Sequence, residues 1–149
     1  MKYVRHLKPD LFSDTIKCVS IGRLPQTMID FIVDKRPEYK NKLFTNNDIL
    51  FWKDRIAHTE LHKNDFMSDI EFETCFEDIP DIIANPDYIS VHPKDGSISF
   101  IRDYLGHVSV AIKISSTGSM AFRTMYPITD AQLTHYMKKG FAWKYPNDL

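Results

Sequence analysis

Cysteine is scarce in this sequence, and glycine occurs in none of the patterns that bind nucleotides. The two cysteines, Cys18 and Cys75, lie far apart and outside any CxxC or Cys/His ligand spacing. Neither a disulfide framework nor a zinc site is therefore indicated. The five glycines form neither GxGxxG nor GxxxxGKS/T, and no serine lies in GxSxG. Nucleotide-binding folds of those types and α/β-hydrolases lack their motifs here.

The sequence also lacks an excess of one charge and a long apolar stretch. The formal net charge is -1 at pH 7, so no overall positive field attracts nucleic acid, and any RNA binding must come from a local patch. No uninterrupted apolar run reaches the length of a membrane span, and no apolar segment follows the charged N-terminus. We therefore expect a cytoplasmic protein without a membrane partner.

What is present is the composition of one globular domain. Hydrophobic residues make up 43% of the 149 residues, and ten Phe and seven Tyr supply much of the bulk. A chain of this size and composition can bury one core. We therefore predict a single domain over residues 1–149, and composition gives no indication of the oligomeric state.

The first half of the chain has the pattern of one strand followed by helices. Residues 16–24 are rich in β-formers, and after Pro25 an apolar stripe of helical spacing begins. This strand and helix form an N-terminal extension, residues 1–44. Polar residues 45–48 could cap a helix over residues 49–63. A further helical segment, residues 69–84, contains Pro80, which should start a fresh turn.

The second half has the pattern of an antiparallel sheet. Strands are predicted over residues 88–91, 97–102, 107–115 and 120–126, and the short connections between them exclude parallel crossovers. A helix should begin near Thr129 and end at Gly140, after which the aromatic C-terminal residues pack and then fray. The predicted fold is α+β, with an N-terminal strand and helices packed on a C-terminal four-stranded antiparallel sheet.

The last hairpin decides which side chains share a face of that sheet. If Thr117-Gly118 is a two-residue turn, Ser115 pairs with Met120, Lys113 with Phe122 and Ala111 with Thr124. Lys113, Thr124 and Tyr126 then share the face opposite Val108 and Val110. A different turn length would slip this register and move the side chains across the sheet.

His58 and His62 are four residues apart in the predicted helix 49–63, so they share one face. Three interpretations stay open: a metal site, an acid/base role for one of the two, or ordinary surface histidines. Position 59 is Thr, so the HExxH pattern of zinc proteases is absent, and no third ligand is evident. No metal or other cofactor is predicted.

A cationic patch on the non-core face of the sheet is the second candidate. Lys113, with Arg123 and Thr124 in the run Phe-Arg-Thr-Met-Tyr, could bind a phosphate, because Lys is a compact charge and Arg a two-pronged donor. The alternative is a solvated sheet face with ordinary charges.

Three segments together carry a family resemblance. They are Ala-His-Thr-Glu-Leu-His-Lys at residues 57–63, Asp-Ile-Pro-Asp-Ile-Ile-Ala-Asn-Pro-Asp-Tyr-Ile-Ser at residues 78–90, and the strand pair from residues 108–115 to residues 122–126. They resemble the phage-type barnase/EndoU/colicin/RelE-like (BECR-like) nucleases over about residues 45–140. The resemblance implies a nuclease-like core there, and an RNase that needs no metal, as found in toxins and phage-encoded proteins.

The resemblance also implies roles for individual residues in the cleavage of RNA by its own 2′-hydroxyl. His62 or His58 would act as base or acid, Lys113 and Arg123 would stabilise the phosphorane charge, and Thr124 or Tyr126 would donate a hydrogen bond. The neighbouring polar candidates for substrate binding are Lys63, Ser109 and Ser115. RNA is the expected partner, and an immunity protein, an antitoxin or a host protein is a further candidate.

The acidic stretch from residue 65 to residue 81 is an unusual neighbour for RNA. It supports an alternative of a different class, a catalytically inactive phage or mobile-element module. Such a module would bind a host protein through the acidic helix 69–84 and the aromatic C-terminus.

Overall fold

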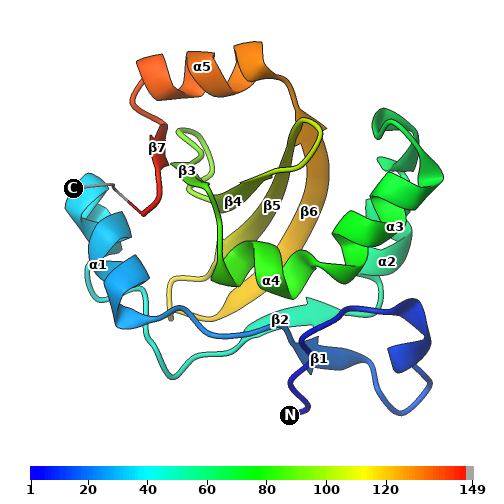
Figure 1. The fold of residues 1–149 in the computed structure, drawn as a ribbon. Coiled ribbons are helices and arrows are strands. Elements are labelled where there is room, and N and C mark those ends of the chain that lie inside the picture. Colours follow the sequence, from blue (N-terminus) through cyan, green and yellow to red (C-terminus); the bar gives the residue numbers. More distant parts are fainter. Residues whose placement is uncertain (147–149) are drawn as a thin grey trace.

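A seven-stranded mixed sheet forms the centre of the protein in a computed structural model, which describes residues 1–146 (Figure 1). The strands are β1 (Cys18–Ser20), β2 (Ile49–Trp52), β3 (Tyr88–Val91), β4 (Ile98–Asp103), β5 (His107–Ile114), β6 (Met120–Ile128) and β7 (Ala142–Lys144). Their order across the sheet is β1-β2-β6-β5-β4-β3-β7. Only β2 and β6 are parallel among the paired strands.

The predicted four-stranded antiparallel sheet is present as the consecutive strands β3 to β6. The α+β class is therefore confirmed, but the sheet has seven strands rather than four. The additional strands join at both edges, β2 and β1 beside β6, and β7 beside β3. Strand β7 has three residues, too few to show a period of two, and it follows Gly140, which ends the preceding helix with φ +74.

Helices cover the sheet and close its ends. The α-helices are α1 (Gln26–Lys35), α2 (Arg55–Glu60), α3 (Asp69–Glu77), α4 (Ile79–Ala84) and α5 (Asp130–Lys138), and the short 3-10 helices are Pro9–Leu11, Pro37–Tyr39 and Lys63–Asp65. Helix α3 begins where Ser68 Oγ accepts a hydrogen bond from the Glu71 amide. Helix α5 begins with a capping box between Thr129 and Gln132. Pro80 lies in the first turn of α4, which is the predicted fresh turn.

The prediction of one helix over residues 49–63 is wrong. Residues 49–52 form β2, in which Ile49 and Phe51 are buried while Trp52 is exposed. Within the predicted range 49–63, the α-helix is limited to α2. The alternation of period two was too short to be distinguished from part of a helical stripe. Pairing with β1 and β6 makes this segment a strand.

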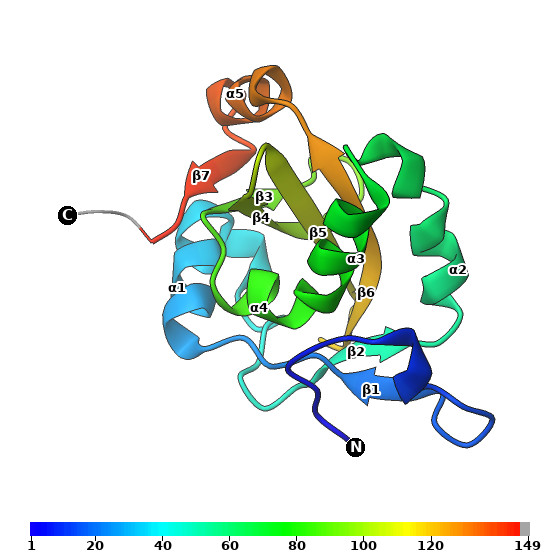
Figure 2. The ribbon, with the colours of Figure 1, turned by 45° about the vertical axis from the view of Figure 1, so that its right-hand side comes forward.

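The two faces of the sheet differ. On one, here the core face, Ile98, Phe100, Val110 and Ile112 are fully buried in the main hydrophobic cluster. Helices α3 and α4 lie over this face (Figures 1 and 2). The opposite, outer face carries the alternate residues, and α5 packs on part of it in a second, smaller cluster that consists of Ile101, Ile128, Leu133 and Ala142. The part of the outer face beyond α5 positions the candidate site.

Candidate active site

A β-bulge in β6 directs two consecutive side chains to the outer face. Ala111 pairs with Thr124, but the next residue of β5, Ile112, pairs with Phe122, so Arg123 is an extra residue in the ladder. The bulged residue and its neighbour then face the same way. Arg123 is exposed and Thr124 is half-buried, whereas Phe122 and Met125 on either side are buried in the core.

The predicted hairpin register is correct on one side of this bulge and wrong on the other. Ala111 pairs with Thr124 as expected. Lys113 pairs with Ala121 instead of Phe122, and Ile114 instead of Ser115 pairs with Met120. The cause is a longer turn, in which the Ser115 amide donates to the Ser119 carbonyl at 2.9 Å. The bulge then offsets the slip, so Lys113, Thr124 and Tyr126 still share the outer face.

Helix α2 lies beside the part of β6 that β2 does not pair. Parallel pairing of β2 with β6 covers only Met120 and Ala121 of β6. Beyond it, Arg55 Nε donates a hydrogen bond to the Arg123 carbonyl oxygen at 3.1 Å. Figure 2 shows α2 next to β6 at this point. The bulge carbonyl is thereby satisfied by a side chain of the helix that carries His58.

Two imidazoles project from α2 and its C-terminal turn toward β6. The ring centroids of His58 and His62 are 6.0 Å apart, and those of His62 and Tyr126 are 6.3 Å apart. His62 Nδ1 lies 3.2 Å from Asp65 Oδ2, which orients the ring. Partial burial lowers the pKa of His58, and the charges of Arg55, His62 and Arg123 lower it further. His58 is therefore neutral at pH 7.

Arg123 forms an ion pair with Asp95, a residue that the sequence did not single out. Asp95 lies in the turn between β3 and β4, where its Oδ1 accepts hydrogen bonds from the Ser97 amide at 3.0 Å and the Ser97 hydroxyl at 2.9 Å. The hydrogen bond from the Ser97 amide contributes most to a pKa of about 2 for Asp95. The only signal in the sequence was the Pro-Lys-Asp-Gly turn at residues 93–96.

Tyr126, Ser109 and Thr124 lie side by side on the outer face. Burial raises the pKa of Tyr126, while a hydrogen-bond interaction with the buried Ser109 acts in the opposite direction. Thr124 Oγ1 is buried and has no hydrogen-bond partner in the part of the chain that the structure describes. Uncompensated burial of a hydroxyl is unfavourable.

The structure does not bring all the predicted residues to this place. Lys113 is exposed on the outer face, opposite Ala121. Ser115 lies in the β5–β6 turn, where its hydroxyl is 2.6 Å from that of Ser119. Lys63 points away toward α3, with Nζ 5.9 Å from the ring centroid of Phe72. Histidines, Arg123, Thr124 and Tyr126 thus form the candidate site, with Lys113 farther along the same face.

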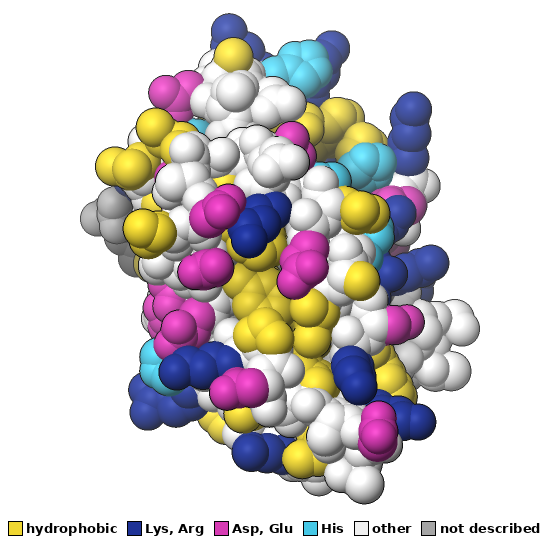
Figure 3. All heavy atoms as spheres, turned by 90° about the vertical axis from the view of Figure 1, so that its right-hand side faces the viewer, with side chains coloured by type: hydrophobic (Ala, Val, Ile, Leu, Met, Phe, Trp, Pro, Cys, Tyr) yellow, Lys and Arg dark blue, Asp and Glu magenta, His cyan; other side chains and the backbone are white. Residues whose placement is uncertain are grey.

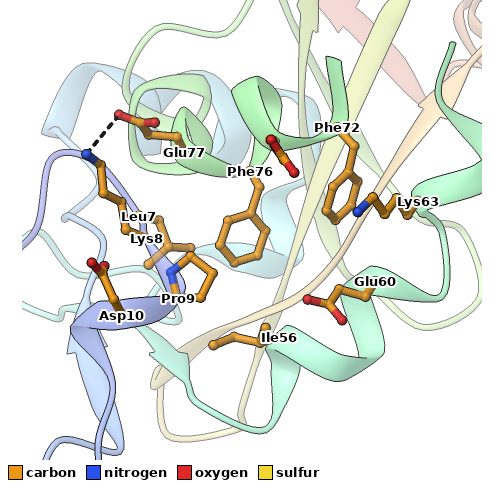
Figure 4. A pocket seen from close by; sticks show the side chains of 11 residues that line it. Leu7, Lys8, Pro9, Asp10, Ile56, Glu60, Lys63, Phe72, Phe76 and Glu77 are labelled. Carbon is orange, nitrogen blue, oxygen red and sulfur yellow. Dashed lines mark ion pairs between the residues drawn. The ribbon is translucent and has the colours of Figure 1, made fainter. Parts of the chain in front are cut away.

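A cavity of about 450 Å³ lies on the other side of α2, between this helix, α3 and the N-terminal segment. Figure 4 shows Ile56, Phe72 and Phe76 turned into it, with the ion pair of Lys8 and Glu77 at its rim. In the space-filling view, apolar side chains gather in this hollow and charged ones surround it (Figure 3). Neither His58 nor His62 lines it.

Within residues 1–146, no three or more His, Cys, Asp or Glu side chains are grouped so as to hold a metal ion. The same residues contain no helix with the length and apolar character needed to cross a membrane.

The fold and the side chains gathered at β6 together are those of a nuclease-like α+β protein. A family model described as phage-Barnase-EndoU-ColicinE5/D-RelE like nuclease3 matches residues 30–135. The chain belongs to this nuclease family, which confirms the resemblance noted in the sequence. The matched residues include β2 to β6 and α2, and therefore all the candidate site residues. No curated protein and no solved structure matched the chain significantly.

Proposed function

We propose that the protein is a metal-independent endoribonuclease, phage- or toxin-related, that cleaves RNA by attack of the 2′-hydroxyl on the adjacent phosphate. The observation that supports this most directly is the position of His58 and His62 on α2 beside the Arg123 bulge. Such cleavage needs a base, an acid and a cation at the phosphate. The substrate of this member of the nuclease family would then be RNA.

His58 is the better candidate for the general base. A base must be unprotonated to accept the proton of the 2′-hydroxyl. Partial burial and the charges of Arg55, His62 and Arg123 lower the pKa of His58, so the neutral imidazole dominates at neutral pH.

His62 is the corresponding candidate for the general acid. Asp65 Oδ2 lies 3.2 Å from Nδ1, which leaves Nε2 to donate a proton to the departing 5′-oxygen. A carboxylate bonded to one imidazole nitrogen fixes the orientation of the ring.

Cations on the sheet would stabilise the charge that develops on the phosphorane. Arg123 lies beside the imidazoles, and Lys113 extends the positive charge along the outer face. Thr124 Oγ1 has no partner within residues 1–146, and the ring centroid of Tyr126 lies 6.3 Å from that of His62, so both hydroxyls are candidates to donate to a phosphate oxygen. These roles follow from the chemistry of the donors at this place.

The test is cleavage of RNA by purified protein in EDTA, with analysis of the product ends. The mechanism predicts 2′,3′-cyclic phosphate and free 5′-hydroxyl ends. Replacement His62→Ala should reduce the rate on the order of 10² to 10⁴ while the protein stays folded. His135→Ala, on the exposed helix α5, is the matched control. Intact tRNA, rRNA and mRNA after incubation with wild-type protein would refute the proposal.

The cavity beside α3 favours a second candidate function, that of an inactive phage or mobile-element module that binds a host protein. Its apolar lining is accompanied by exposed apolar side chains nearby in the chain, since Leu61, Met67 and Ile70 are 78%, 78% and 76% exposed. Exposed apolar patches often mark protein interfaces. A stoichiometric partner lost on Glu73→Lys at the cavity rim, with RNA left intact, would favour this function over the enzyme.

A further inference from the structure

Helix α2 carries different side chains on two of its sides. His58 and His62 face β6, where the ring centroids of His62 and Tyr126 are 6.3 Å apart. Ile56 and Glu60, which are four residues apart and therefore share a face, line the cavity between α2, α3 and the N-terminal segment. A molecule bound in this cavity would therefore lie on the side of α2 away from the imidazoles.

The N-terminal segment forms the third wall of the cavity. Leu7 is fully buried, and its amide donates a hydrogen bond to the Glu77 carbonyl oxygen of α3 at 2.9 Å. Pro9 and Asp10, in the short 3-10 helix that follows, also line the cavity. These residues precede the range 30–135 that the family model matches. Membership of the nuclease family therefore does not imply this cavity.

Apolar side chains form the floor of the cavity. The rings of Phe72 and Phe76 on α3 are 6.1 Å apart between centroids, and Ile56 of α2 packs against the same hydrophobic cluster. Figure 4 shows all three side chains directed into the cavity. Its volume of about 450 Å³ lies within the roughly 300–1,000 Å³ of pockets that bury an apolar group. The floor therefore suits one large apolar or aromatic side chain.

Charged side chains surround this floor, and most of them are acidic. The carboxylates are those of Asp10, Glu60, Glu73 and Glu77, and the cations are those of Lys8 and Lys63. Both lysines already have a carboxylate neighbour, since Lys8 Nζ lies 4.0 Å from Glu77 and Lys63 Nζ lies 4.0 Å from Asp69.

Three carboxylates of the rim are left over. The side chains of Asp10, Glu60 and Glu73 form no hydrogen bond or ion pair with any residue from 1 to 146. Figure 4 shows Asp10 and Glu60 on either side of Ile56 and Phe76. The rim therefore keeps a surplus of negative charge around an apolar floor.

This charge distribution favours one kind of occupant. A second copy of the chain would bring an identical acidic rim against this one, and RNA would bring phosphates, so both would be repelled. A protein segment with lysine or arginine beside an apolar side chain would be attracted by the rim and buried by the floor. Ile70, which is 76% exposed and lies one turn before Glu73 on α3, extends the apolar surface beyond the cavity. A chain segment can cover that extension, whereas a small molecule within the cavity cannot.

We propose that the cavity is the docking site for a cationic segment of a partner protein. The segment inserts one large apolar or aromatic side chain between α2 and α3, and it places a lysine or arginine at Glu60 and Glu73. This site goes beyond the proposed function, because it lies on the side of α2 away from the imidazoles and would serve an active nuclease as well as an inactive module. It also gives the partner of the second candidate function a defined chemistry.

The experiment selects binders from a yeast-displayed library of random linear peptides on the wild-type protein. The enriched peptides are then titrated, by fluorescence anisotropy, into the wild type, Glu60→Lys, Glu73→Lys and Ile56→Phe. The two lysine variants reverse the charge of exposed side chains, whereas Ile56→Phe fills the cavity. Glu38→Lys is the matched control, because Glu38 is exposed and does not line the cavity. Sedimentation of the wild type and Glu73→Lys without peptide tests self-association.

Enriched peptides should combine a large apolar or aromatic residue with a nearby lysine or arginine, and they should bind Glu38→Lys as they bind the wild type. Glu60→Lys and Glu73→Lys should each weaken binding by about tenfold. Ile56→Phe should weaken it too, and if that variant does not fold, the two lysine variants decide.

Three results would overturn the proposal. They are the absence of enriched peptides, enriched peptides without a cation, and affinities that do not change in Glu60→Lys and Glu73→Lys. A wild-type dimer that dissociates in Glu73→Lys would instead assign the cavity to a second copy of the chain. None of these measurements depends on cleavage of RNA, so the docking site and the proposed function can fail separately.

Discussion

Asp95 and Arg123 join the β3–β4 turn to the bulge of β6 by an ion pair. The Ser97 amide and hydroxyl also donate to Asp95, so the guanidinium at the candidate site is paired with a carboxylate that hydrogen bonds fix in its turn. Arg123 is thus oriented from one side by Asp95, while its backbone carbonyl accepts from Arg55 on the other.

This attachment predicts a loss of stability in acid. The pKa of Asp95 is about 2 in the folded protein, below the value of about 3.9 for an unfolded chain. A depressed pKa contributes stability that is present above about pH 4 and lost as pH falls toward 2. The free energy of unfolding, measured with urea, should decline between pH 5 and pH 2, and this decline should be smaller in Asp95→Asn. Asp34→Asn, at an 80% exposed carboxylate, should behave like the wild type. Equal pH dependence in Asp95→Asn would contradict this role.

The lowered pKa of His58 predicts the pH range over which kcat/KM rises on the acidic side of the pH–rate profile. As a general base, His58 must lose its proton, so kcat/KM should rise with pH and level off below the ordinary histidine value of about 6.5. Removing a nearby charge with Arg55→Gln should raise the pKa of His58 and move this limb to higher pH. Lys53→Gln, in the turn before α2, is the control. A limb that does not move in Arg55→Gln would count against His58 as the base.

The raised pKa of His107 predicts that stability depends on pH in the opposite direction. Burial disfavours its charged form, but hydrogen bonds to Asp103 and to Asp130 at the start of α5 outweigh this and raise the pKa. A raised folded-state pKa gives stability that is fully present below the unfolded value, about 6.5, and lost as pH rises through the folded value.

The free energy of unfolding should therefore fall as pH increases from about 6 upward, by roughly 1 kcal/mol, as expected for lost charged hydrogen bonds. His107→Gln should flatten this slope, whereas His135→Gln, on the exposed part of α5, should not. Unfolding followed by tyrosine and tryptophan fluorescence at several pH values measures it. An identical slope in His107→Gln would show that this histidine does not link α5 to the sheet.

The backbone conformation of Gly118 and the space around it predict that a larger residue there destabilises the hairpin that carries Arg123. Its φ is +90, and a Cβ there would lie 2.7 Å from Cε2 of Phe44. Gly118→Ala should destabilise the protein by roughly 1–3 kcal/mol, because both the backbone conformation and the space oppose it. Gly106→Ala is the matched control, since nothing lies within 4 Å of its Cβ position. Equal melting temperatures for the two variants would contradict the argument.

The central sheet could be predicted because its signal is local. In β5, core residues such as Val108 and Val110 alternate with Ser109 and Ala111, and this period of two is visible without knowledge of the partners. The same signal failed in β2, where four residues are too few and where the parallel partner β6 lies about 70 residues away, judged from Ile49 opposite Met120.

The candidate site was less predictable than the sheet. The spacing of His58 and His62 indicated that they are neighbours, which they are, although His62 follows α2 instead of lying within it. The bulge at Arg123 and the pair with Asp95 depend on how two hairpins meet, and no local pattern encodes that meeting.

Helix α2 has a second consequence through its place beside β6. Unpaired backbone groups along a strand invite pairing with another chain, which leads to aggregation. Arg55 donates a hydrogen bond to the Arg123 carbonyl oxygen, beyond the two residues of β6 that pair with β2. The helix that presents the imidazoles therefore also protects this edge of β6 from pairing with a strand of another chain. Selection for solubility and selection for a reactive surface would therefore act on the same short helix, and variants that loosen it should lose both together.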